Sequence, residues 1–156
     1  MIIELSRVSR ILAGILLLSL VTVETGGLYM VRLVGYGADA TDFQLGFARA
    51  GHAHAGVLLI LSLVGLVYAD AARLTGISGI LGRFCVPVAA LLMPAGFFFS
   101  SIREGATAPN GLIVLVWIGG LSLAVGLITL GIGMLRSGLR RGAGTPAHPG
   151  TPAGTP

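Results

Sequence analysis

Charged residues are scarce in this sequence. They make up 10% of its 156 residues, and lysine is absent, because all ten basic residues are arginine. A soluble domain carries roughly 25% charged residues, which it needs to cover a water-facing surface. The chain is also 54% apolar, with a mean hydropathy of +0.94. This composition excludes a soluble globular fold and predicts a small integral membrane protein of one domain.

Other absences exclude whole classes of function. Cys85 is the only cysteine, so the chain can form no internal disulfide and has no CxxC pair. It also has no P-loop, nucleophile elbow or paired-carboxylate motif, so nothing supports a hydrolase and no catalysis is predicted. Basic residues do not alternate with aromatic ones along a stripe. The high pI, near 10.2, therefore does not indicate nucleic-acid binding.

Four apolar runs predict an all-α fold, a bundle of four transmembrane helices. Each run has about the 20 residues that a helix needs to cross the hydrocarbon of a bilayer, and a backbone in lipid must satisfy its own hydrogen bonds. The predicted helices cover residues 11–34, 46–69, 84–102 and 111–135. They form one domain over residues 1–141, and the Gly/Thr/Pro/Ala-rich tail of residues 142–156 is predicted to be disordered.

The arginines predict the orientation of this bundle. Seven of them fall on the side of the two termini and three on the other side, where acidic residues offset them. Cytoplasmic loops carry the excess of basic residues, so both termini are expected in the cytoplasm. The seven are Arg7, Arg10, Arg73, Arg83, Arg136, Arg140 and Arg141; the three are Arg32, Arg49 and Arg103, near Asp39, Asp42 and Glu104.

Ionisable side chains gather in the outer half of the predicted bundle. At a rise of about 1.5 Å per residue, His52 lies about 9 Å and His54 about 12 Å below the outer end of the second helix. By the same count, Met93 lies at about 13 Å and Glu24 at about 15 Å, near the bilayer centre. A charged acid there costs about 2.5–3.5 kcal/mol, so Glu24 is expected to be neutral, paired or beside water. Arg49 and the two histidines are its candidate partners.

The spacing of the histidines restricts what they can bind. Residues at i and i+2 point about 200° apart on a regular helix, so His52 and His54 cannot hold one metal ion together. Since neither imidazole is expected to face lipid, the second helix should be central in the bundle or part of a homodimer interface. Four uses stay open for the histidines: an axial haem ligand, a metal site with Glu24, a proton relay, or hydrogen bonds within the bundle.

The segment Arg49-Ala50-Gly51-His52-Ala53-His54 resembles a known pattern. Its R-x-x-H spacing is similar to the haem-ligand segment in the second helix of haem–copper oxidase and nitric oxide reductase catalytic subunits. H-x-H before an aliphatic run also resembles small bacterial four-helix membrane proteins compared with that superfamily. The resemblance implies that His52 is the low-spin haem ligand. The predicted third and fourth helices have no histidine, so one chain cannot build a complete oxidase centre.

These observations lead to one leading hypothesis and two alternatives. The first is binding of haem b or a metal ion through His52 and His54, with Glu24 and Arg49 as supporting partners. The second axial ligand of such a haem would be His54, His52 of another copy, Met30 or Met93, unless the haem is five-coordinate. The alternatives are a structural or assembly partner of another membrane complex, and a proton or small-solute pathway through Glu24. The expected surroundings are the lipid of a bacterial plasma membrane and a homo-oligomer or a larger complex.

Overall fold

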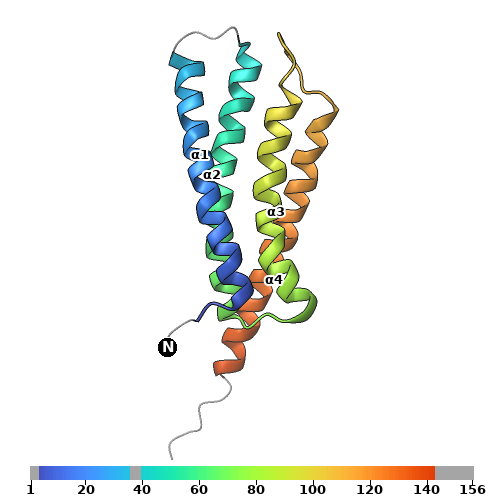
Figure 1. The fold of residues 1–156 in the computed structure, drawn as a ribbon. Helices are drawn as coiled ribbons and strands as arrows, with labels where there is room; N and C mark the ends of the chain where they lie inside the picture. Colours follow the sequence, from blue (N-terminus) through green and yellow to red (C-terminus); the bar gives the residue numbers. More distant parts are fainter. Residues whose placement is uncertain (1–3, 36–39, 143–156) are drawn as a thin grey trace, which may run out of the picture.

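The computed structural model describes residues 4–35 and 40–142, and these residues form helices and connections without a strand. Figure 1 shows four long helices that run alternately up and down, so that α1 begins and α4 ends at the same end of the molecule. All four are long and apolar enough to cross a membrane. The predicted all-α fold is therefore confirmed, and the chain is a multi-pass membrane protein. The helices are α1 (Arg7–Gly35), α2 (Asp42–Ala71), α3 (Gly76–Ser100) and α4 (Val114–Gly142), with the 3-10 turn η1 (Gly111–Ile113) before α4.

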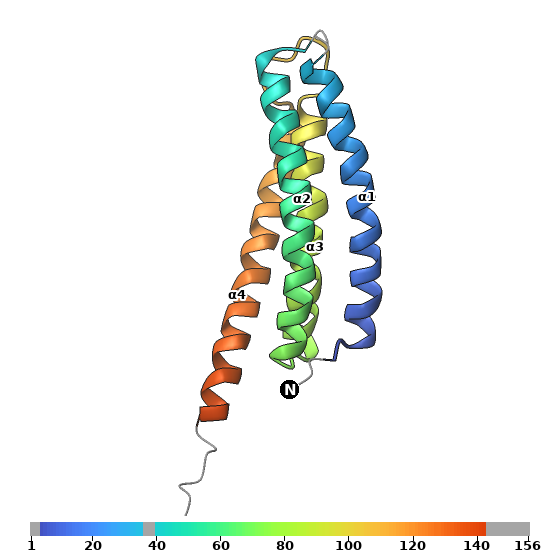
Figure 2. The same cartoon turned by 90° about the vertical axis from the view of Figure 1, so that its left-hand side faces the viewer.

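The bundle is open, with α2 and α3 at its centre. In Figure 2, α1 and α4 lie on opposite sides of the α2–α3 pair. α1 packs mainly on α2, and α4 mainly on α3. The best-buried leucines therefore come from the middle of the bundle, where Leu58 and Leu66 of α2 contact Leu16 of α1 and Ala90 of α3. Most apolar side chains of α1 and α4 face outward.

The observed helices differ from the predicted apolar runs at their ends. α1 and α2 are longer at both ends, whereas α3 stops at Ser100 and α4 starts only at Val114. α3 begins at Gly76, eight residues before the predicted start, and α2 ends at Ala71, so the connection between them is a short turn. The prediction placed Arg83 just before the third helix, because a charged residue interrupts an apolar run. In the structure, this arginine lies inside α3 and is paired with Asp70 of α2. Similarly, α4 continues past residue 135 with its arginines on the helix. Of the predicted tail, Gly142 ends α4 and the rest lies outside the described residues.

The α2–α3 turn has a regular hydrogen-bonded form. The Arg73 amide donates to Asp70 O (3.0 Å), and the Leu74 amide donates to Ala69 O (2.9 Å). These two bonds make a Schellman motif at the end of α2. Such a motif needs a left-handed residue, usually glycine, and here Arg73 has φ of 53°. The turn directs Leu74 into the contact between α3 and α4, where its side chain lies against Gly82 and Gly133.

Glycines of α4 bring it close to α3. A β-carbon at Gly119 would lie 2.6 Å from Met93 Cγ, and one at Gly126 would lie 2.9 Å from Val86 Cγ2. Gly133 is in similarly close contact with Leu74. These three glycines are seven residues apart, so they lie on one face of α4, where small residues let two membrane helices approach closely. Gly120 and Gly131 of the same helix have open space around them.

Candidate functional site

His52 lies in the contact between α2 and α1. Its ring is beside two glycines of α1: a β-carbon at Gly26 would lie 3.6 Å from Nδ1, and one at Gly27 would lie 3.6 Å from Nε2. The ring is half-buried, and it makes no hydrogen bond within the described residues. Gly56, which follows on α2, faces Val23 of α1 at van der Waals distance. The glycines thus make room for the imidazole itself, and α1 already fills the space beside it.

His54 faces the other side of α2. Its Nδ1 lies 2.7 Å from Ala50 O. A carbonyl can only accept, so Nδ1 carries the proton and donates, which leaves Nε2 as the acceptor atom. The ring lies 5.0 Å from the ring of Phe97 of α3, centroid to centroid, and Phe97 in turn contacts Phe47 of α2. The prediction that the histidines point to opposite sides of a central helix is confirmed.

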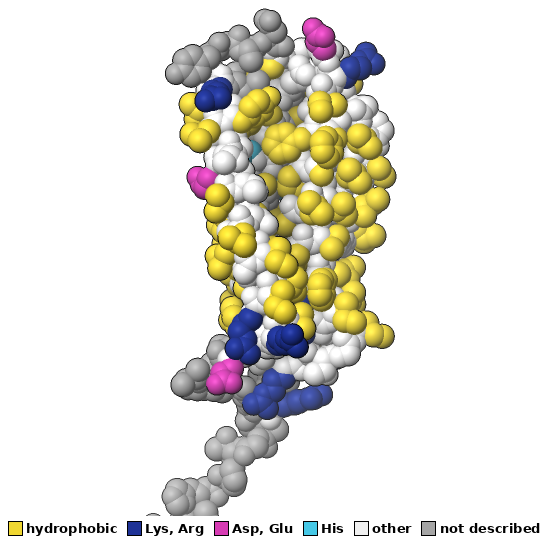
Figure 3. Space-filling model, viewed as in Figure 1, with side chains coloured by type: hydrophobic (Ala, Val, Ile, Leu, Met, Phe, Trp, Pro, Cys, Tyr) yellow, Lys and Arg dark blue, Asp and Glu magenta, His cyan; other side chains and the backbone are white. Residues whose placement is uncertain are grey.

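Glu24 and Arg49 are exposed on the surface of the chain. Within the described residues, Asp70 and Arg83 form the one ion pair, and no hydrogen bond is made by the Glu24 carboxylate. In Figure 3, acidic side chains stand at both ends of the molecule, and magenta also shows part-way along the apolar surface. Of the three expected states of Glu24, a pair with Arg49 or a histidine is thus not formed within the described residues.

Met93 belongs to a helix contact. Its Cγ and backbone nitrogen lie directly against Gly119 of α4, and its side chain packs on the buried leucines of the bundle centre. The structure therefore places Met93 where it fixes the distance between α3 and α4. Of the five candidate residues, none is brought into a hydrogen bond or ion pair with another.

The residues of one chain do not fit a haem held by two axial ligands. The two imidazoles point to opposite faces of α2, and α1 closes the space beside His52 at van der Waals distance. Among the described residues, no group of three or more His, Cys, Asp or Glu side chains is placed to hold a metal ion. Within the described residues, no second axial ligand faces His52.

Sequence reasoning missed a buried polar cluster at the arginine-rich end, the end where α1 begins and α4 ends. Arg83 of α3 contacts Asp70 of α2 at 2.5 Å and donates to Leu74 O and to Ser9 Oγ. The other Asp70 oxygen accepts from the Ser6 amide (2.9 Å). This cluster joins α1, α2 and α3. The signal in the sequence is an acid and a base that flank the same short connection.

A second polar contact was missed at the arginine-poor opposite end. Thr41 and Gln44 form a capping box at the start of α2. The Gln44 amide also donates to Ser101 O and Arg103 O in the loop after α3, and Thr41 Oγ1 donates to Ala106 O. Threonine followed three residues later by glutamine is the sequence pattern that predicts such a cap.

No protein-family model, curated protein or solved structure matches the chain. The resemblance of residues 49–54 to a haem-ligand segment therefore stays a prediction.

Proposed function

We propose that the protein is a non-catalytic subunit of a multi-subunit membrane complex, held to its partner by the exposed face of α1 around Glu24. The observation that carries this proposal is the position of Glu24: it is exposed near the middle of a membrane-spanning helix, without a partner in the described chain. Carboxyl groups within membrane segments almost always face a bundle interior or a water-filled cavity. A second chain on this face of α1 supplies that interior.

The residues around Glu24 form a suitable contact face. Leu17, Val21, Leu28 and Val31 are all more than half exposed, and with Glu24 they are spaced alternately four and three residues apart. This spacing places them on one stripe of α1, as in helix pairs that interlock side chains. Glu24 is the single polar residue of this stripe, with apolar residues before and after it. A partner helix therefore needs a polar side chain at the same depth in the membrane as Glu24.

Charge determines the kind of partner. Two copies of this stripe would bring two Glu24 carboxyls together, and like charges oppose each other most strongly where water is excluded. A different chain with a basic or hydrogen-bond-donating side chain at the depth of Glu24 satisfies the carboxylate instead. The proposed partner is therefore another membrane subunit with such a residue.

The mass of the extracted complex tests the proposal. The protein is taken from its own membranes in lipid nanodiscs and weighed by native mass spectrometry. The wild type and Glu24→Gln are expected with a second, different chain, because an amide still forms a hydrogen bond. Glu24→Leu is expected to lose that chain. Glu104→Gln is the matched control, since it removes an exposed acid from the loop after α3. A wild-type monomer would contradict the proposal.

Haem b or metal-ion binding at His52 is the second candidate, favoured by a ring that lacks a hydrogen-bond partner within the described residues. It requires α1 to move away from the ring, because Gly26 and Gly27 lie against it. The ligand on the other side would come from the partner subunit. The same preparation tests it through the visible spectrum, oxidised and reduced. A Soret band that is lost in His52→Ala supports haem, whereas a colourless complex without bound metal would remove this candidate. A pathway through Glu24 has less support, because this residue lines neither of the two best-formed cavities of the described residues.

The proposed location is the plasma membrane of a bacterium, with both termini in the cytoplasm. Its support is the distribution of arginine, because cytoplasmic ends of membrane helices carry the excess of basic residues. In Figure 3 most of the basic side chains gather at the lower end of the molecule. A fluorescent protein fused after residue 156 tests the orientation: fluorescence places the terminus in the cytoplasm, and a fusion that is dark but fully made would contradict it.

A further inference from the structure

A groove opens at the arginine-rich end between the α2–α3 turn and the last turns of α4. Its volume is about 710 Å³, which lies in the range of small-molecule sites, roughly 300–1,000 Å³. Three exposed arginines line it, and none of its lining residues is acidic. The lining residues used below are Arg73, Arg136 and Arg140, with Ser78, Ile77 and Ile132.

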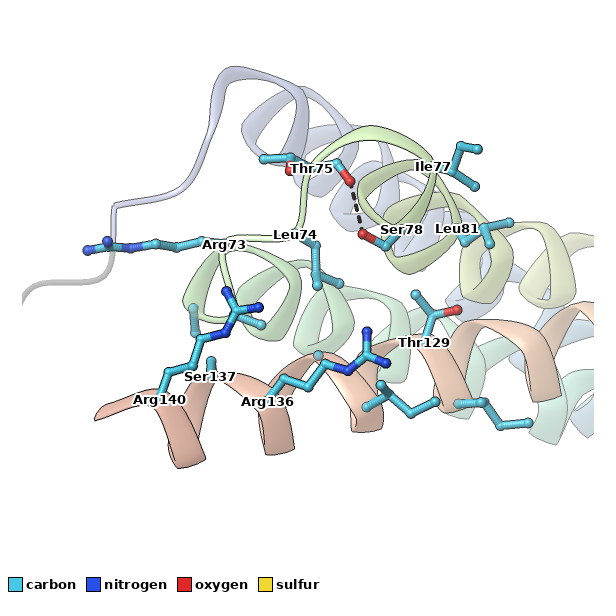
Figure 4. A pocket seen from close by; sticks show the side chains of 15 residues that line it. Arg73, Leu74, Thr75, Ile77, Ser78, Leu81, Thr129, Arg136, Ser137 and Arg140 are labelled. Atoms are coloured by element: carbon cyan, nitrogen blue, oxygen red, sulfur yellow. Dashed lines mark hydrogen bonds between the residues drawn. The ribbon is translucent and has the colours of Figure 1, made fainter. Parts of the chain in front are cut away.

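The arginines of the groove are available for a ligand. Figure 4 shows Arg136 and Arg140 rising from α4 toward the turn that carries Leu74, while Arg73 extends outward from that turn. None of the three forms an ion pair within the described residues, and Asp70, the acid nearest to Arg73 in the sequence, is held by Arg83. Guanidinium groups bind phosphate oxygens in pairs of hydrogen bonds, so Arg136 and Arg140 together suit a phosphate ester, with Arg73 at the rim.

Arg73 lies at the rim of the groove, and its backbone conformation there has a cost. It occupies the left-handed position of the turn (φ 53°), where an L-residue costs roughly 1–2 kcal/mol and glycine is the usual choice. Strain of this kind at a special position is typical of functional sites. Here the strained residue lies at the rim of the groove, with its side chain directed outward.

The remaining walls of the groove are apolar and lie within the membrane-spanning helices. Ile77 and Leu81 of α3 and Ile128 and Ile132 of α4 line this part of the groove. Hydroxyl groups lie among these apolar residues: Ser78 Oγ donates to Thr75 O (2.9 Å), and Thr129 lies across from it on α4. A ligand that matches this order has a negative headgroup and a hydrocarbon tail.

We propose that this groove binds the phosphate headgroup of an anionic phospholipid from the leaflet at the arginine-rich end, with an acyl chain against the isoleucines. Basic pockets between transmembrane helices, placed at headgroup depth, have the charge and position that anionic lipids need. A soluble phosphate compound would use the arginines but leave the apolar walls uncovered.

Lipid selectivity of the complex in mild detergent tests the proposal. Spin-labelled phosphatidylglycerol and phosphatidylcholine are added separately, and the fraction of immobilised label is measured. The wild type is expected to favour phosphatidylglycerol at least about fivefold. Arg136→Gln with Arg140→Gln is expected to remove the preference, and the double change to lysine to keep most of it. Ser78→Trp, which fills the groove and keeps every charge, is expected to remove it as well.

The matched control is Arg7→Gln with Arg10→Gln. These two exposed arginines lie on α1 at the same end of the bundle and outside the groove, so the proposal expects the preference to persist. An equal loss in the two arginine pairs, or a preference that survives Ser78→Trp, would show that surface charge alone attracts the lipid. Displacement by inorganic phosphate, beyond that by sodium chloride of equal ionic strength, would show a soluble-phosphate site. Each of these three results would overturn the proposal.

Discussion

The Asp70–Arg83 pair shows how a single buried contact can hold three helices. Both side chains are largely buried, with 5% and 12% of their surfaces exposed. Each is satisfied by further hydrogen bonds, to the Ser6 amide on one side and to Leu74 O and Ser9 on the other. Removing one partner from a buried pair leaves an uncompensated charge, whereas removing both does not.

We expect Asp70→Asn to lower the free energy of unfolding by about 3–5 kcal/mol, because Arg83 then stays buried without its counter-charge. The exposed Arg10→Gln is the control and should change it by less than about 0.5 kcal/mol. Thermal unfolding in detergent, followed by circular dichroism, measures both. The double variant Asp70→Leu with Arg83→Leu should recover part of the lost stability. Equal stability of Asp70→Asn and the wild type would contradict a stabilising role of the pair.

Glu24 and Asp70 are both acids in membrane-spanning helices, but their surroundings differ completely. Asp70 lies at a helix end among donors from two other helices. Glu24 lies on the outer face of α1 and has no donor within the described chain. This contrast is the reason for assigning stability to one residue and association to the other.

At the scale of the helices, contact between α3 and α4 depends on glycine. Gly119, Gly126 and Gly133 lie on one face of α4, and each has atoms of α3 or of the turn before it within 3 Å of where a β-carbon would be. Pro87 and Pro94 do not interrupt α3 along this contact. The close approach explains why α4, which buries few large side chains, still packs tightly.

Adjacent glycines of α4 allow a matched test of this contact. Gly119→Ala places a methyl group 2.6 Å from Met93 Cγ and 3.0 Å from its backbone nitrogen, so we expect a loss of roughly 1–3 kcal/mol from overpacking. Gly120→Ala meets no atom within 4 Å and should gain up to about 1 kcal/mol from helix propensity. Unfolding in detergent compares the two, and a loss in Gly120→Ala as large as in Gly119→Ala would refute the assigned contact.

The number and type of the helices could be predicted from the sequence because each apolar run is long enough for only one structure in lipid. The opposite directions of His52 and His54 followed from helix geometry alone. The start of α3 could not be predicted in this way. Arg83 interrupts the apolar run in the sequence, and nothing in the run shows that its charge is paired with Asp70 within the bundle. The exposure of Glu24 could not be predicted either, because α1 is apolar around most of its circumference and its sequence does not indicate which face packs on the bundle.

Over the whole molecule, three surfaces remain for other molecules. The stripe of α1 around Glu24 fits another membrane helix, and the groove at the arginine-rich end fits an anionic headgroup. Other apolar side chains of α4, such as Trp117 and Leu121, are exposed and suit lipid chains. The exposed position of Glu24 and of the groove arginines agrees with the proposed subunit role.

Cross-linking from α1 in native membranes tests the central claim most directly. Leu28 of α1 and Leu121 of α4 are equally exposed, at 68% and 69%. Each is replaced by cysteine in a Cys85→Ser background, labelled with a photoactivatable maleimide and irradiated. We predict that Leu28→Cys cross-links to one different membrane protein, that Glu24→Leu abolishes this product, and that Leu121→Cys gives none. No product from Leu28→Cys, equal products from both sites, or a dimer of this chain alone would contradict the account.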